Sequence, residues 1–296
     1  MNKIKKSNSR IIFEVFNILF SLFMVAISVY PILYVLFASV SDSNALLRHG
    51  GMPLFKPLEF NLEAYKSAFR NPNIFIGYRN TVFIVFVGTF LSLFLSSVGA
   101  YFMSRKNVLW KGIISKFILF TMFFSGGLIP FYLTVKELHL TGTIWSLIIP
   151  VSISTYNLII LRTAFASIPE SLTESARVDG AGHMTILFRI VLPLSKATLA
   201  VIALYYGVTY WNSWFHASIF LTGASDKWPL QLVLQQILIA NSTASMTGVV
   251  SIGDEQSIGE SIKYAVIIIA TVPILCIYPF LQRYFESGVM IGAVKE

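Results

Sequence analysis

The charged and hydrogen-bonding residues that could do chemistry are concentrated in one segment, residues 162–196. Within it, Ser167-Ile168-Pro169-Glu170 has the pattern of a capping box, in which the serine and glutamate side chains bond the first amides of a helix and proline fits the first turn. This pattern predicts a short helix over residues 168–179. Gly180 can end it, because glycine adopts positive φ without strain. A second helical run follows over residues 183–192, where a proline breaks it.

The short predicted helix is amphipathic. Ile168, Leu172 and Ala176 recur every four residues and form one small apolar edge. Glu174 and Arg177 lie within reach of each other at a spacing of three. A capped amphipathic helix with a tight turn after it can dock in a groove on a partner protein. It can also lie flat on lipid headgroups, since amphipathicity alone does not distinguish the two.

Catalytic and metal-binding motifs are missing from the sequence. It contains no G-x-x-x-x-G-K-[ST] loop for nucleotide phosphates and no H-E-x-x-H zinc motif. The single cysteine, Cys276, excludes an internal disulfide and lies in an apolar run, so we expect it to be buried. We therefore expect no enzyme activity, no cofactor and no metal site. Any energy that the function uses must come from another subunit.

A second set of candidate residues combines aromatic rings with neutral amides. Such groups could bind a polar ligand through ring faces and hydrogen bonds if they line a pore. The alternative is an aromatic belt at the bilayer edge or ordinary helix packing. The candidate substrate-path residues are Tyr156, Asn157, Tyr210, Trp211, Asn212 and Trp214.

A membrane-embedded scaffold must hold these residues. The 296-residue chain is 55% hydrophobic and only 12% charged, about half the charged fraction of an ordinary soluble domain. Its mean hydropathy is +0.72, and its apolar residues come in long blocks. The net charge of +8 does not indicate a nucleic-acid partner, because the basic residues are spread through short loops beside those blocks.

Six uncharged blocks are long enough to cross a lipid bilayer as helices, so the expected fold is an all-α, polytopic membrane protein with six transmembrane helices. The first block is too long for the apolar core of a cleaved signal peptide, and we expect a retained helix. The expected spans are Val15–Ser41, Asn80–Ser104, Phe117–Val135, Leu140–Leu161, Ala197–Ser225 and Tyr264–Gln282.

The loop charges predict the orientation. With the N-terminus inside, 14 of the 22 Lys and Arg residues fall in inner segments and 8 in outer ones. Positive residues favour the cytoplasmic side, so both termini are predicted to be cytoplasmic and 162–196 becomes the largest inner loop. The outer segments are 42–79, in which Asn61 can cap a short helix through Phe69, and 226–263.

The inner loop carries a recognisable motif. The run Glu174-Ser175-Ala176-Arg177-Val178-Asp179-Gly180, followed after nine residues by Ile190-Val191-Leu192-Pro193, resembles the E-A-A-x3-G-x9-I-x-L-P motif of permease subunits of bacterial ABC importers. Ser175 replaces the family's alanine, one small residue for another. The runs Trp211-Asn212-Ser213-Trp214-Phe215 and Trp228-Pro229-Leu230-Gln231 and the ending 285–295 are similar to the carbohydrate-uptake branch, the maltose-type permeases.

The resemblance implies a type I ABC importer permease fold with three regions: residues 1–75 (tail, first span and outer loop), 76–283 (transmembrane domain) and 284–296 (cytoplasmic tail). It implies as partners a second permease subunit, two ATP-binding subunits, an extracellular solute-binding protein, an oligosaccharide substrate and the lipid bilayer. Residues 226–263 occupy the place of a loop that enters the binding protein in the maltose-type member, and 288–295 that of a tail reaching the ATPase.

By the same resemblance, Glu174, Ala176, Arg177, Asp179 and Gly180 form the ATPase-coupling element. Glu174 would make the polar docking contact, and Gly180 would permit the turn.

The expected function is a permease subunit in the bacterial plasma membrane that moves oligosaccharides inward by alternating access, coupled to a separate ATPase through residues 168–193. One alternative is an ABC permease for a non-sugar solute. The other is a stand-alone secondary carrier, although the predicted spans lack the ionisable residues that such carriers use at mid-membrane.

Overall fold

The computed structural model describes residues 7–106, 108–246, 261–277 and 279, with the backbone alone from 240 to 246. All named elements in these ranges are helices, which confirms the all-α prediction. The described chain divides into two compact units. The first unit holds the described residues up to 71 together with those in 237–271, and the second holds residues 72–236 together with the described residues from 272.

The first unit contains α1 (Asn8–Ser39), α2 (Ser43–His49) and α3 (Glu63–Arg70). The carboxylate of Asp42 begins α2 by accepting the N–H groups of Asn44 at 2.9 Å and Ala45 at 3.2 Å. The hydrogen bond from the Ala45 amide is the main cause that lowers the pKa of Asp42. Asn61 accepts the N–H of Glu63 at 2.9 Å just before α3, but Leu62 takes the N-cap position, so the helix begins one residue later than predicted.

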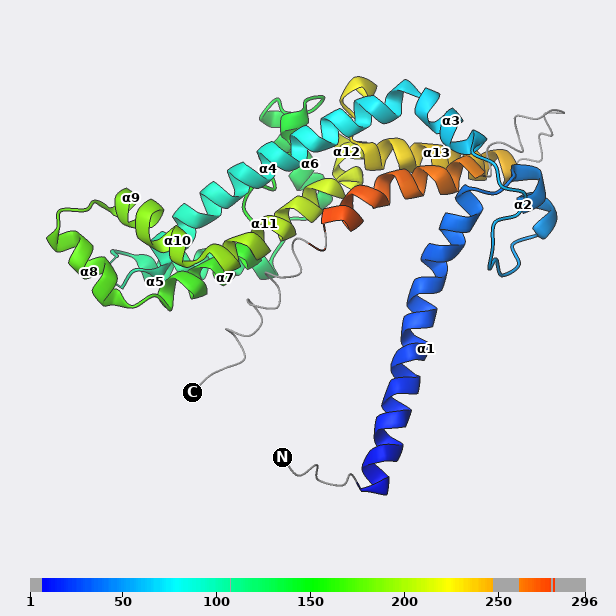
Figure 1. Cartoon of the computed structure of the whole chain (residues 1–296). Coiled ribbons are helices and arrows are strands. Elements are labelled where there is room, and N and C mark those ends of the chain that lie inside the picture. Colours follow the sequence, from blue (N-terminus) through cyan, green and yellow to red (C-terminus); the bar gives the residue numbers. More distant parts are fainter. Residues whose placement is uncertain (1–6, 107, 247–260, 278, 280–296) are drawn as a thin grey trace. The chain divides into compact units, whose positions relative to one another are not determined.

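The second unit is built on α4 (Pro72–Ser104), a single apolar helix. Ile84, Gly88, Ser92, Ser96 and Ala100 recur every four residues and form a buried stripe, which is narrow because most of its residues are small. This stripe lets α11 (Lys196–Trp211) and α7 (Thr155–Ala166) pack closely along α4. Figure 1 shows α4 and α11 running side by side through this unit.

The remaining named helices are shorter than α4. They are α5 (Lys111–Phe123), α6 (Leu128–Glu137), η1 (Ile144–Leu147), α8 (Glu170–Val178), α9 (His183–Ile186), the π-helical η2 (Leu187–Val191), α10 (Leu192–Leu194), α12 (Trp214–Phe220), η3 (Ser225–Lys227) and α13 (Leu230–Met246). A further apolar helix covers Ser261–Ile277.

By length and composition, two described helices can cross a membrane, α1 and α4. The number rises to four if each of two bent pairs counts as one span: α5 with α6, bent by 118°, and His183–Leu194 with α11, bent by 88°. The predicted first two spans are therefore confirmed as continuous helices. In the second bent pair, the helix continues through the proline expected to stop it and bends at Ser195 instead.

Three predicted spans are not continuous helices. The block 117–135 bends between α5 and α6, where Gly127 has a φ of +86°. The block 140–161 contains only the short η1 and the start of α7, because Pro150 interrupts the amide ladder and Ser154 caps a new helix by accepting the Asn157 N–H at 3.4 Å. The block 197–225 is split between α11 and α12. The last block, 264–282, is helical to residue 277, and the rest lies outside the described residues apart from 279.

Two side chains of α4 hold the segment that follows α12 by hydrogen bonds. The Asn80 amide donates to the carbonyls of Asp226 at 2.9 Å and Trp228 at 3.1 Å. The Thr81 hydroxyl accepts the N–H of Leu230 at 2.8 Å. These bonds satisfy backbone groups that a helix would otherwise satisfy internally, and they hold the first residues of the 226–263 segment against α4.

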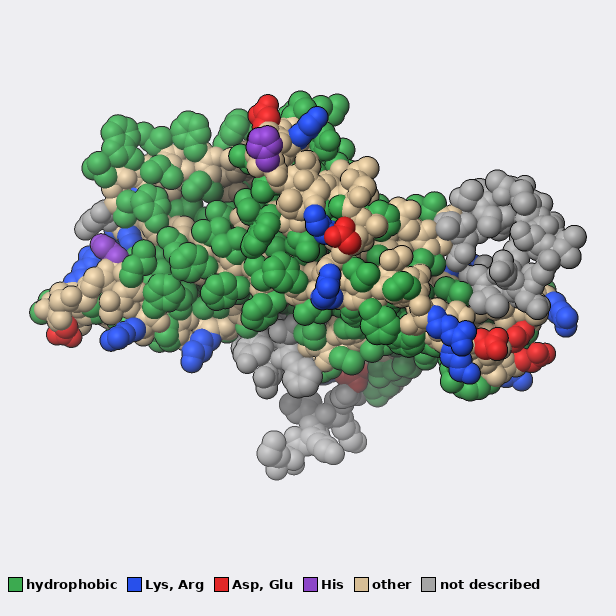
Figure 2. Space-filling model, turned by 90° about the horizontal axis from the view of Figure 1, so that it is seen from above, with side chains coloured by type: hydrophobic (Ala, Val, Ile, Leu, Met, Phe, Trp, Pro, Cys, Tyr) green, Lys and Arg blue, Asp and Glu red, His purple; other side chains and the backbone are tan. Residues whose placement is uncertain are grey.

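The outer surface is strongly apolar. Figure 2 shows one face covered largely by hydrophobic side chains, with charged side chains near the end of the second unit where α8 lies. Phe86 and Phe90 on α4 are 76% and 70% exposed in the isolated chain. Cys276 is also exposed, so the prediction of a buried thiol is wrong. An apolar block that faces lipid or a partner chain, rather than the protein's own core, leaves its cysteine on the surface of the single chain.

Candidate coupling element and substrate groove

Helix α8 begins differently from the prediction. The hydroxyl of Ser167 donates back to the carbonyl of Ala164 at 2.8 Å, because Ser167 still ends α7. The carboxylate of Glu170 bonds Lys106 and not an amide. The capping-box interpretation is therefore wrong, and Pro169 occupies the position before the first helical residue.

The turn after α8 forms as predicted. Gly180 has a φ of +85°, in the left-handed region that favours glycine. Its N–H bonds the carbonyl of Arg177 at 3.0 Å, and the next amide, of Ala181, bonds the carbonyl of Ala176 at 2.8 Å. A Cβ built on Gly180 meets nothing within 4 Å, so the requirement for glycine comes from the backbone and not from crowding.

The two faces of α8 differ in burial. Thr173 is 2% exposed, and Ala176 packs against the main core cluster. Leu172 is 45% exposed and Val178 is 88% exposed. The predicted apolar edge is thus wrong for Leu172, because the sequence alone does not show that a threonine takes the inward position. The remaining predicted coupling residues are exposed: Glu174, Arg177, Asp179 and Gly180.

A polar brace links α8 to the end of α4. We use this name for Tyr101, Arg105, Lys106, Glu170 and Thr173. The Nζ of Lys106 donates to Glu170 at 2.6 Å, and Arg105 donates to the Thr173 hydroxyl at 3.4 Å. The Arg105 guanidinium also lies 4.7 Å from the centre of the Tyr101 ring. The hydrogen bond with Lys106 lowers the pKa of Glu170 and raises that of Lys106.

The polar brace borders a cleft of about 760 Å³ between the end of α4 and the α7–α8 connection. Tyr101 extends the link to α9, because its hydroxyl lies 3.3 Å from Nδ1 of His183. In the sequence, Arg105 and Lys106 contribute only to the predicted orientation. Both carry a charge opposite to that of Glu170, which could have suggested a contact. Lys106 and Glu170 are 64 residues apart, however, and the sequence gives no geometric reason to pair them.

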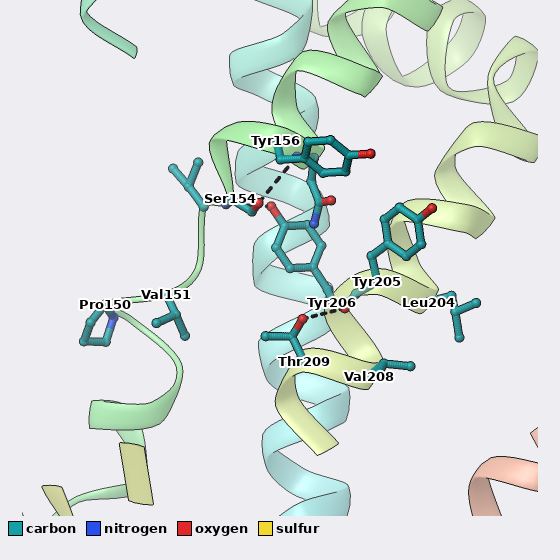
Figure 3. A pocket seen from close by; sticks show the side chains of 11 residues that line it. Pro150, Val151, Ser154, Tyr156, Leu204, Tyr205, Tyr206, Val208 and Thr209 are labelled. Carbon is teal, nitrogen blue, oxygen red and sulfur yellow. Dashed lines mark hydrogen bonds between the residues drawn. The ribbon is translucent and has the colours of Figure 1, made fainter. Parts of the chain in front are cut away.

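A second feature is an open groove beside α11. Its volume is about 800 Å³, and residues 150–157 and 204–209 contribute its lining. Figure 3 shows the Tyr206 ring extending from α11 to the segment around Ser154, with Tyr156 and Tyr205 nearby. The described lining contains no charged side chain; its polar members are Ser154, Tyr156, Asn157, Tyr205, Tyr206 and Thr209.

The predicted substrate-path residues are only partly brought together. Tyr156 and Asn157 line this groove. Tyr210 and Asn212 line a smaller pocket of about 330 Å³. Both pockets are lined by Val151, Val208 and Thr209, so they adjoin along α11.

The two tryptophans line neither pocket. Trp211 is 7% exposed and meets Tyr78 edge-on, and Trp214 meets Phe215 edge-on. The prediction missed Ser213, whose hydroxyl is buried in the smaller pocket with no hydrogen-bond partner in the described part of the chain.

The groove has the chemistry of a site for a polyhydroxylated ligand. Aromatic faces pack against apolar ring faces, while hydroxyl and amide groups exchange hydrogen bonds. Nothing in the described residues groups three or more His, Cys, Asp or Glu side chains as metal ligands. The structure thus separates an open groove between helices from a surface helix, ended by the Gly180 turn, at one end of the same unit.

A membrane transport protein is the class that these features define: apolar spanning helices, a broken segment lining a groove, and a helix–turn–helix exposed beside the bundle. The comparisons agree. The family model described as "Binding-protein-dependent transport system inner membrane component" matches residues 2–291. The chain belongs to this family, which contains transporter permeases and not enzymes. It is a multi-pass membrane permease of a bacterial ABC importer.

Several relatives are similar over nearly their whole length. Protein LplC of Bacillus subtilis is 41% identical over 287 residues, which is 96% of this chain and 95% of LplC. The polygalacturonan/rhamnogalacturonan transport system permease protein YtcP of the same organism is 40% identical over 283 residues, 93% of this chain and 96% of YtcP. A crystal structure of a bacterial ABC transporter that imports the acidic polysaccharide alginate contains a chain with a TM-score of 0.85 and 29% identity, covering 96% of this chain and 100% of that one.

Proposed function

We propose that this chain moves oligosaccharides into the cell by alternating access, as one permease of an importer driven by a separate ATPase. The observation that carries the substrate class is the groove of about 800 Å³, lined by tyrosines and neutral hydrogen-bonding groups. The similarity to YtcP, named for polygalacturonan and rhamnogalacturonan transport, and to the alginate transporter supports an oligosaccharide substrate. An uncharged groove between helices of a membrane protein suits a ligand that is polar but presents apolar ring faces.

The coupling role belongs to α8 in this proposal. Glu174 and Val178, four residues apart, share its exposed face and can enter a groove on an ATP-binding subunit with one carboxylate and one apolar side chain. Ala176 has a different role, because it packs inward and must stay small. Gly180 shapes the turn, and the exposed Arg177 and Asp179 lie at its rim.

The polar brace gives this coupling a mechanical path. A displacement of α8 by the ATPase would pull on the end of α4 through the Lys106–Glu170 and Arg105–Thr173 contacts. Helix α4 packs along α7 and α11, which carry the groove. Movement of α8 can therefore change the access of the groove to either side of the membrane.

The proposed assembly contains a second permease, two ATP-binding subunits and an extracellular solute-binding protein. We place both termini in the cytoplasm, since most Lys and Arg residues then lie inside. We further propose that 226–263 meets the binding protein and that 288–295 reaches the ATPase. Residues 247–260 and 288–295 lie outside the described residues. We also propose that residues 76–283 form the transmembrane domain, between the N-terminal region 1–75 and the cytoplasmic tail 284–296.

Uptake in a strain lacking this chain tests the substrate class. Cells complemented with the chain should accumulate a labelled oligosaccharide, and the uncomplemented strain should not. Normal uptake of every tested oligosaccharide by the deletion strain, with loss of a peptide or amino acid, contradicts the sugar assignment.

Purified components test the energy source. Transport by reconstituted vesicles should require the ATP-binding subunits and ATP. Transport by the purified chain alone would identify a stand-alone carrier. In a pull-down with the ATP-binding subunit, Glu174→Ala should bind less, while Glu137→Ala, on the predicted outer side, should bind like the wild type. Equal binding by both variants contradicts docking through Glu174.

A further inference from the structure

One part of the wall of the substrate groove is not helical. Between η1 and α7, residues 148–154 form turns and extended backbone, and Pro150, Val151 and Ser154 line the groove. Backbone N–H and C=O groups inside a bilayer have no water to bond, so a broken segment must find partners in the protein. Side chains from another helix supply two of them.

The first partner is Tyr206 of α11. Its hydroxyl accepts the N–H of Ser154 at 3.0 Å, at the start of α7. The same hydroxyl shares a hydrogen bond of 2.7 Å with Ser96 of α4. Tyr206 is 2% exposed and Ser96 is fully buried. One phenol group thus joins three elements, and its position depends on the buried serine.

The second partner is Tyr210, one turn further along α11. Its hydroxyl lies 2.8 Å from the Ser92 hydroxyl of α4 and donates to the carbonyl of Ile148 at 3.4 Å. Gly88 makes room for the ring, because a Cβ built there would lie 2.7–2.9 Å from its atoms. The spacing of Tyr206 and Tyr210 matches that of Ser96 and Ser92, so the two helices present two equivalent contacts.

We propose that Tyr206 and Tyr210 form a tyrosine clamp that positions the groove wall and thereby determines affinity for the transported ligand. Tyr206 holds one end of the 148–154 segment and Tyr210 holds the other. The clamp carries no charge and needs only the phenol oxygens. The identity of the ligand in this inference rests on the proposed function. The clamp itself is inferred from the hydrogen bonds of the two tyrosines.

Tyr206→Phe isolates the hydroxyl, since the ring and its packing remain. Without it the N–H of the half-buried Ser154 and the hydroxyl of the buried Ser96 both lose this partner. In the intact importer reconstituted in vesicles, we expect the half-saturating oligosaccharide concentration to rise about tenfold, the effect of one unpaired buried group. The maximal rate should change less, because α8 and its contacts are untouched. Ser96→Ala should have a smaller effect, because the bond to Ser154 remains.

Tyr132→Phe is the matched control. The Tyr132 ring stacks on Phe220 and lies outside the groove lining, so this variant should transport like the wild type. Hydrogen–deuterium exchange on the same complexes without ligand gives a second measurement. Peptides covering 148–158 should exchange faster in Tyr206→Phe, and those from α8 should not.

The outcomes separate the two proposals. Failure of the wild-type complex to transport any oligosaccharide contradicts the proposed function, while the exchange result still tests the clamp. Unchanged exchange in Tyr206→Phe overturns the clamp. Faster exchange with unchanged half-saturation overturns its role in affinity. A fall in maximal rate alone, shared by Tyr132→Phe, also overturns it, because that pattern reflects general damage to the fold.

Discussion

The turn between α8 and α9 offers a quantitative test, because glycine is required at position 180 only by the positive φ of the backbone. The φ of Gly180 is +85°, and a Cβ built there meets no atom within 4 Å. A non-glycine residue in the left-handed region costs about 1–2 kcal/mol. That cost reduces the population of the native turn about 5- to 30-fold, since about 1.4 kcal/mol corresponds to a factor of ten. Asparagine enters this region more readily, and a β-branched residue less so.

The assay compares three substitutions in the reconstituted importer. We expect affinity for the ATP-binding subunit, and ATP-driven uptake, to fall in the order Gly180→Asn, Gly180→Ala, Gly180→Val, with the amount of membrane-inserted protein unchanged. Gly182→Ala is the control two residues away. Gly182 has a φ of −73° and open space around it, so an alanine fits without strain. Wild-type coupling in Gly180→Val, or an equal loss in Gly182→Ala, refutes the reasoning.

Three further predictions concern other contacts. Lys106→Glu should reduce ATP-driven uptake, and adding Glu170→Lys should restore it. Because the pKa of the native Glu170 is lowered, the native pair is lost only as pH falls through that lowered value, so wild-type uptake should not change through loss of this pair between about pH 6 and 8. Gly88→Ala should lower the free energy of unfolding in detergent by about 1–3 kcal/mol, since its methyl group meets the Tyr210 ring. Asn80→Ala should lower it by about 1–3 kcal/mol by leaving two carbonyls unpaired. Unchanged unfolding midpoints would contradict the last two.

Features that depend on local sequence were predictable. The long apolar runs identified α1 and α4, and glycine chemistry identified the turn at Gly180. Asn61 lies close to the start of α3, although Leu62 takes the N-cap position. In each case the determining interactions lie within a few residues along the chain, where composition and spacing carry the information.

Features that depend on tertiary contacts were not predictable. Ser167 and Glu170 fit a capping box, but Ser167 bonds the preceding helix and Glu170 bonds a lysine 64 residues away. The block 140–161 is apolar enough for a span, yet it is broken at Pro150, and Tyr206 and Tyr210 of α11 provide partners for the backbone groups that the break leaves free. A single sequence does not show those partners. For the same reason the groove contains Tyr156 and Asn157 but neither Trp211 nor Trp214.

Crosslinking from α8 tests the coupling claim most directly. Val178 is 88% exposed on α8, and Cys276 is the sole native cysteine, so Val178→Cys in a Cys276→Ser background carries one reactive thiol. In the purified complex, a short bifunctional reagent should join this residue to the ATP-binding subunit. An impermeant maleimide applied outside intact cells should leave it unmodified. Labelling from outside, or no crosslink in a complex that still transports, would contradict the role of α8 as the contact with the ATPase.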